Sequence, residues 1–403
     1  MSQQTLSPLK RSIVGVQFMF VAFGSTVLVP LLVGFDPAIA LLAAGLGTLL
    51  FHAVTGGKVP IYLGSSFAFI APIIKATELY GLSGMFCGLV AVGLVYILMS
   101  FLVKLFGVNF IKKLFPPIVI GPVIILIGLS LAGTGVDMAS KNWILALVSL
   151  FVAIICSCWG KGMIKLIPVV FGALAGYIVA VIFYRSSMDF SGVANAPWFQ
   201  LPHFSKMSLS WQAIVFMAPV AIAPIIEHVG DVYAISEIAG KDFVKDPGLH
   251  RTMLGDGLAC TLAAFLGGAP VTTYSEVTGA VSLTKVTDPA CMRIAALSAI
   301  LISLVGKVGA AIQTIPTAVL GGIMLLLFGS IASVGINNLV KAQIDMNKTR
   351  NLIIASLILT IGIGGAVISF GKFSLAGIGL ASVVGVILNL IIPDKKETEE
   401  VNS

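Results

Sequence analysis

Twelve long apolar runs dominate this 403-residue chain and restrict the folds open to it. Each run is long enough to cross the roughly 30 Å hydrocarbon layer of a bilayer as a helix. Only 10% of the residues carry charge and 58% are apolar, which leaves too few charges for the surface of a soluble protein. The sequence therefore predicts an all-α polytopic membrane protein and excludes a soluble enzyme. The runs cover residues 13–34, 37–55, 83–109, 114–135, 143–159, 162–184, 211–235, 252–268, 289–306, 308–337, 351–370 and 373–393.

Two further segments, residues 58–76 and 268–284, are also long enough to enter the membrane but are interrupted. Each begins with a proline, Pro60 or Pro270, and a short β-prone stretch, and then passes through small polar residues into an apolar tail. Lipid tolerates irregular backbone only where the backbone is buried in protein or lines a cavity. These two segments are therefore expected to form a binding site, and they raise the predicted number of crossings to fourteen.

The basic residues predict the orientation of these crossings. When the chain alternates sides from a cytoplasmic N-terminus, 18 of its 24 Lys and Arg residues lie inside. This bias follows the positive-inside rule, and it places both termini in the cytoplasm. The basic residues are scattered between apolar runs rather than clustered on one face, so nucleic acid is not an expected partner despite the net charge of +7.

The chain is predicted to contain an internal repeat, with a polar connector from about residue 185 to 210 between two halves of seven crossings. An odd number of crossings in each half requires the second half to be inverted. The interrupted segments occupy matching positions in the two halves, which is the strongest sequence indication of a transporter's binding site. A second match, which chance similarity could also produce, pairs Pro116, Gly121, Ser130 and Ala132 with Pro316, Gly321, Ser330 and Ala332.

Three acidic residues stand out because almost all the others lie in loops or in the C-terminal tail. Glu227 and Asp231 lie four residues apart in one apolar run, and Glu276 lies in the second interrupted segment. An ionisable group at the centre of a membrane helix costs about 2.5–3.5 kcal/mol, so each is a candidate functional residue. Asp231 could alternatively be solvated near a helix end. His228 is expected to pack or form hydrogen bonds, and Asp256 is expected at the membrane interface.

The interrupted segments supply further candidate ligand contacts. In the first, Ser66 and Phe67 follow Ser65 at the point where a helix is expected to begin, and Tyr274 and Ser275 occupy the matching place in the second. Free amides at a helix N-terminus donate hydrogen bonds, and an aromatic ring can stack on a planar ligand. Together with the carboxylates, these groups would suit a flat, neutral heterocycle.

Several motifs resemble the nucleobase-ascorbate transporter family over essentially the whole chain. They are FGSTVLVP (23–30), KVPIYLGSSFAFIAP (58–72), EHVGD (227–231), KDPGLHRTM (245–253) and TTYSEVTGAVSLTK (272–285). The resemblance implies a proton-coupled uracil symporter of the bacterial inner membrane that works by alternating access. No cofactor or metal is expected beyond the coupling proton. The alternatives are a purine carrier of the same family, an anion exchanger of the same fold and an intramembrane enzyme.

The resemblance also implies a domain organisation and a set of site residues. Fourteen segments form two inverted repeats, with short antiparallel strands in segments 3 and 10. A core domain comprises residues 1–107 and 211–306, a gate domain comprises 108–190 and 307–393, the connector is 191–210 and a cytoplasmic tail is 394–403. Some family members form homodimers through the gate domain. The implied substrate contacts are Glu227, Glu276, Phe67, Ser66, Ser25, Tyr274, Ser275 and Phe328, and the implied proton carriers are Asp231, Glu227 and Glu276.

The chain departs from the family pattern at four positions. Val277 stands where the family usually has Asn, and Phe18 stands where the first segment often has His. Asp231 replaces a His found in some uracil carriers, and Phe328 stands where a Tyr can occur. These differences leave the expectation of transport intact and bear mainly on which base is carried.

Overall fold

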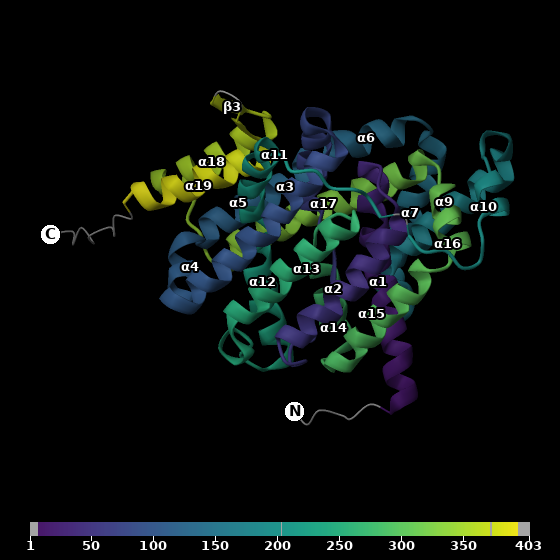
Figure 1. Ribbon diagram of the computed structural model, residues 1–403, viewed down its shortest axis with the longest axis horizontal. Coiled ribbons are helices and arrows are strands. Elements are labelled where there is room, and N and C mark those ends of the chain that lie inside the picture. The colour runs from purple at the N-terminus through teal and green to yellow at the C-terminus, as the bar shows by residue number, and fades with distance from the viewer. Residues whose placement is uncertain (1–6, 203, 371–372, 394–403) are drawn as a thin grey trace.

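The computed structural model describes residues 7–202, 204–370 and 373–393, and Figure 1 shows that these residues form a bundle of helices. The predicted tail, residues 394–403, lies outside the described residues. The helices are α1 Pro8–Val33, α2 Pro37–Val54, α3 Ile70–Phe106, α4 Val108–Leu114, α5 Pro117–Ser130, α6 Ala132–Ser140, α7 Trp143–Trp159, α8 Met163–Leu166, α9 Pro168–Phe183, α10 Ser191–Asn195, α11 Trp211–Met217, α12 Ile222–Ala239, α13 Leu249–Leu266, α14 Ser275–Thr284, α15 Pro289–Ser303, α16 Gly306–Gln313, α17 Thr317–Lys341, α18 Thr349–Ile363 and α19 Gly377–Ile391.

Six helical spans in the described ranges are long and apolar enough to cross a membrane, and α15 with α16 forms a seventh that bends by 83°. The six are residues 8–33, 37–54, 67–106, 117–140, 211–239 and 317–341. Four shorter apolar helices, α7, α9, α18 and α19, accompany them. The fold is therefore that of a polytopic helical membrane protein, as the composition predicts.

Two predicted crossings are interrupted in the structure. The run 308–337 is divided into α16 and α17, because Pro316 cannot continue α16 and instead precedes α17 in an extended conformation. The run 351–370 ends its helix at Ile363, where Gly364 and Gly365 (φ +65°) follow. Strands β3 Val367–Phe370 and β4 Phe373–Ala376 then pair antiparallel, in place of the helix that the apolar run predicts.

The structure confirms the internal repeat at its two best-matched points. Pro116 caps α5 and Pro316 caps α17, and these two helices pack together. Their contact is close, because a Cβ on Gly121 would lie 2.4 Å from the Leu339 side chain. The interrupted segments contain β1 Leu63–Ser65 and β2 Val271–Thr273, which pair antiparallel with Leu63 opposite Thr273. This is the pairing that the family resemblance implies.

The helices pack in two sets that determine where this strand pair lies. In one set, α13 packs against α2 and α3, and α15 packs against α1 and α2. In the other, α17 packs against α5, α6 and α7, α7 against α9, and α18 against α5 and α19. In Figure 1, α1, α2 and α13 lie centrally, α18 and α19 lie at the left, and α7 and α9 lie at the right. The strands β1 and β2 contact α2 and α13 of the first set.

Candidate functional site

The two interrupted segments meet at the β1–β2 ribbon and leave it as helices at matching points. After β1, Ser66 is extended (φ −82°, ψ 131°) and precedes a 3₁₀ turn, Phe67–Phe69, which leads into α3. After β2, Tyr274 is extended (φ −105°, ψ 111°) and precedes α14. The first amides of a helix have no partner inside the helix. Two helix starts therefore present hydrogen-bond donors at the two ends of one short ribbon.

Tyr274 links the two halves of this ribbon. Its hydroxyl donates to the carbonyl of Ser65 (2.8 Å) and lies 3.4 Å from the Thr26 hydroxyl of α1. Gly64 allows this arrangement, because a Cβ there would lie 2.3 Å from the Tyr274 ring. The ring is buried, so the glycine is needed for close approach. Tyr274 thus holds the start of α14 against the end of β1.

Glu276 lies in the first turn of α14, where the helix dipole favours a negative charge. Its Oε1 accepts a hydrogen bond from the Ser25 hydroxyl of α1 (3.2 Å), and the residue is only partly buried. The structure therefore brings together two predicted site residues that are 251 positions apart. A partly exposed carboxylate held in this way is suited to accept an N–H group from a ligand.

Asp231 on α12 joins the same site, whereas the sequence left open that it is solvated. Its side chain is buried, and its Oδ1 accepts a hydrogen bond from the Ser275 hydroxyl (2.6 Å). Its Oδ2 has no partner within the described part of the chain. Glu227, one turn earlier on α12, is half-buried. Carboxylates gathered in a poorly hydrated place favour a neutral ligand that donates N–H groups over an anion.

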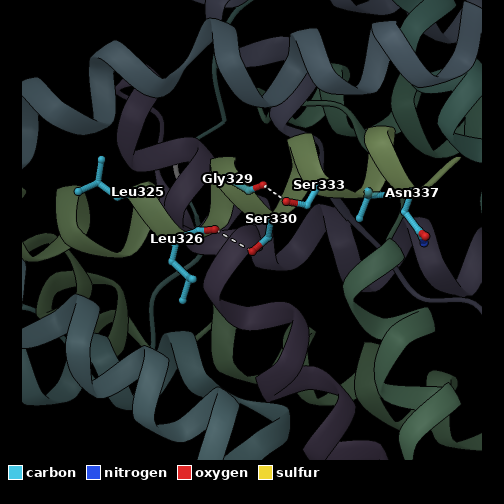
Figure 2. Close-up of a pocket in the computed structure, with 7 residues that line it drawn as sticks. Leu325, Leu326, Gly329, Ser330, Ser333 and Asn337 are labelled. Carbon is cyan, nitrogen blue, oxygen red and sulfur yellow. Dashed lines mark hydrogen bonds between the residues drawn. The ribbon is translucent and has the colours of Figure 1, made fainter. Parts of the chain in front are cut away.

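Phe67 and Phe328 form the aromatic side of the site. Their ring centroids are 5.8 Å apart and the rings are nearly perpendicular, so α17 contacts the first helix start at this point. Residues of α17 that lie on either side of Phe328 in the sequence line a concave pocket of about 590 Å³. Figure 2 shows that apolar residues such as Leu325 and Leu326 line it together with polar ones, and that Ser330 and Ser333 donate to the carbonyls of Leu326 and Gly329. Apolar and polar side chains therefore share this face of α17, and the buried Phe328 is not among the residues that line it.

His228 and Asp256 form a buried pair behind the carboxylates. The expected hydrogen-bonding role of His228 is confirmed, because its Nδ1 lies 2.9 Å from Asp256 Oδ2. The expectation that Asp256 lies at the membrane interface is wrong, since the residue is fully buried. The apolar run begins near Asp256, but α13 already begins at Leu249. Asp256 is therefore near the middle of the helix and not at its start. The sequence does not reveal this because the first turns of α13 are polar.

The interrupted helices, the short ribbon between them and the buried carboxylates define a membrane transporter built from two repeats. The fold is similar to that of the transmembrane domain of the cyanobacterial bicarbonate transporter BicA, with a TM-score of 0.60 and 18% identity over 96% of this chain and 99% of that one. A model described as "Permease family" matches residues 9–370. The chain belongs to this permease family, the nucleobase-ascorbate transporters that its motifs resemble, and is not an enzyme.

Relatives in this family match nearly the whole chain. The "Probable uracil permease" of Pasteurella multocida is 50% identical over 398 residues, which is 96% of this chain and 95% of that protein. The "Uracil permease" of Bacillus caldolyticus is 45% identical over 400 residues, which is 95% of this chain and 92% of that protein.

Proposed function

We propose that this protein is a uracil permease that imports uracil together with a proton across the bacterial cytoplasmic membrane. The observation that carries the proposal is the hydrogen bond between Ser25 and Glu276 at the start of α14, opposite the helix start that follows β1. Uracil has two ring N–H donors and two carbonyl acceptors. The carboxylates of Glu276 and Glu227 would accept from the ring, and the free amides near Ser66 and Ser275 would donate to its carbonyls.

The remaining predicted residues complete this site. Phe67 would stack on the pyrimidine ring, with Phe328 at right angles behind it, which supports a planar ligand. Tyr274 would fix the backbone that contacts the base. Asp231 and one of the glutamates would share the coupled proton, because neighbouring carboxylates in a low-dielectric site disfavour double ionisation.

Uptake of labelled uracil tests this function directly. The gene is expressed in a bacterial strain that lacks its own uracil permease, and uptake is measured with and without a protonophore. We expect saturable uptake that the protonophore abolishes. Competition by unlabelled xanthine and guanine distinguishes a pyrimidine carrier from a purine carrier. A lack of saturable uracil uptake would refute the proposal.

The proposal includes fourteen transmembrane segments with both termini in the cytoplasm. The six long spans, the bent pair and the four shorter apolar helices support it, as does the distribution of basic residues. In a cysteine-free background, Trp198→Cys should react with an impermeant thiol reagent only from outside and Lys245→Cys only from inside. Both side chains are highly exposed, at 75% for Trp198 and 85% for Lys245. The opposite labelling pattern would refute this orientation.

The proposed core domain (1–107 and 211–306) would move against the gate domain (108–190 and 307–393) to alternate access. The two sets of packed helices support this division, because α13 packs mainly against α2 and α3, whereas α17 packs mainly against α5, α6 and α7. Cross-linking Gly24→Cys to Val169→Cys, which joins the two domains because a Cβ on Gly24 would lie 3.2 Å from Val169 Cβ, should block uptake, and reduction should restore it. Homodimer formation through the gate domain is a further proposal, and sedimentation of the detergent-solubilised protein tests it.

A further inference from the structure

The β1–β2 ribbon has only two strands, so half of its backbone groups point away from the partner strand. Tyr274 N–H faces inward and donates to Tyr62 O (3.2 Å), whereas Thr273 N–H faces outward. Leu63, opposite Thr273, likewise directs its amide away from β2. The ribbon is fully buried, and a buried amide without a partner is costly. Side chains must therefore satisfy both outer edges.

Helix α2 satisfies the outer edge of β1 with two side chains one turn apart. Leu63 N–H donates to Thr48 Oγ1 (2.9 Å), and the same hydroxyl lies 3.4 Å from the Leu63 carbonyl. His52 Nε2 donates to the carbonyl of Ile61 (3.0 Å). Thr48 and His52 are both buried. The pair thus holds the amide of Leu63 in β1 and the carbonyl of Ile61, two residues earlier in the chain.

Helix α13 satisfies the outer edge of β2 with the same geometry. Thr273 N–H donates to Asp256 Oδ2 (3.3 Å), and Cys260 Sγ donates to the carbonyl of Val271 (3.0 Å). Asp256 and Cys260 are again four residues apart, and the groups they hold are again two residues apart. Thr48 and Asp256 are therefore equivalent positions of the two repeats.

Thr48 and Asp256 differ in chemical type and in the side chains that contact them. Thr48 is neutral, whereas Asp256 is an acid. Its Oδ2 lies 2.9 Å from Nδ1 of His228 on α12. A carboxylate only accepts, so His228 donates from Nδ1, and its Nε2 lies 2.9 Å from Thr252 Oγ1. Asp256, His228 and Thr252 are all fully buried. The two strands are therefore held by different chemistry, with a carboxyl group accepting from Thr273 N–H (3.3 Å) and a hydroxyl accepting from Leu63 N–H (2.9 Å).

We propose that Asp256 is the positioning residue of the half-site that contains Glu276, and that Thr48 has the equivalent role for the half-site that contains Phe67. Thr273 is followed directly by Tyr274 and then by α14, so the Asp256 bond fixes the backbone from which Glu276 extends. Asp256 acts through the strand and does not touch the substrate. The expected effect of Asp256 on uracil binding rests on the proposed function. Its expected effect on the backbone of β2 does not.

Hydrogen exchange on the ligand-free protein tests the strand contact independently of any substrate. In Asp256→Ala, we expect the Thr273 amide to exchange at least tenfold faster than in the wild type. Asp256→Asn should restore part of the protection, because the amide oxygen still accepts a hydrogen bond. Thr261→Val is the matched control on the same helix, since its hydroxyl bonds only within α13. Unchanged exchange in Asp256→Ala would overturn the inference.

Uracil affinity tests the positioning role. We expect Asp256→Ala to weaken binding at least tenfold, Thr48→Val to weaken it severalfold, and Thr261→Val to leave it within twofold. Thr48→Val keeps the volume of the side chain, so it keeps the inference testable if Asp256→Ala does not fold. Wild-type affinity in Thr48→Val, and in Asp256→Ala where that variant folds, would overturn the positioning role. If the wild type binds no uracil, the proposed function fails, and the exchange experiment alone decides the strand contact.

Discussion

Replacing Glu276 with Gln tests the central contact of the proposed site. The change conserves shape, and the remaining oxygen can still accept from Ser25, so the start of α14 should keep its structure. The other carboxylate oxygen is replaced by an NH₂ group, which would face a ring N–H of uracil. Two hydrogen-bond donors would then oppose each other. A hydrogen bond to a charged group contributes about 1.5–3 kcal/mol. At 1.4 kcal/mol for each factor of ten, uracil binding should weaken about 10- to 150-fold.

Equilibrium binding of labelled uracil to the purified protein measures this effect, and the Tm confirms that the variant is folded. Glu78→Gln is the matched control, because Glu78 is 59% exposed and pairs only with Lys75 on the surface (3.0 Å). Exposed ion pairs contribute little, so Glu78→Gln should bind within twofold of the wild type. If Glu276→Gln binds uracil within threefold of the wild type, its carboxylate does not accept from the base and the reasoning fails.

Three further changes test other parts of the structure. Gly64→Ala would place a Cβ 2.3 Å from the Tyr274 ring and should lower the free energy of unfolding by about 1–3 kcal/mol and weaken uracil binding, as denaturation and binding assays would show. Arg350→Ala removes three hydrogen bonds to the end of α19 and should destabilise the protein by about 2–4 kcal/mol without changing uracil affinity. Asp231→Asn keeps an oxygen that can accept from Ser275, so it should bind uracil within threefold of the wild type but fail to accumulate it in proteoliposomes under a pH gradient. Equal loss of binding and accumulation would count against proton coupling by Asp231.

The sequence predicted the features that depend on one segment at a time. Long apolar runs predict membrane helices because the transfer of a segment into lipid depends on its own composition. Glu227, Asp231 and Glu276 stand out for the same reason, since each is an expensive group in an apolar segment. The prolines and small polar residues near Pro60 and Pro270 similarly indicate irregular backbone. The family motifs then supplied the aromatic and serine contacts.

Only the tertiary structure decided which of these groups meet. The family resemblance implied the strand pair, but nothing in the sequence sets the contact of Ser25 with Glu276 or the register of Leu63 opposite Thr273, because each partner lies more than 200 residues away. Asp256 looked like an interfacial residue because local polarity cannot reveal that the backbone of β2, 17 residues later, needs its carboxylate. The cost of burying a polar group depends on the segment that contains it, so this cost can be inferred from the sequence. The hydrogen bond that offsets this cost belongs to two segments at once, and the fold alone determines it.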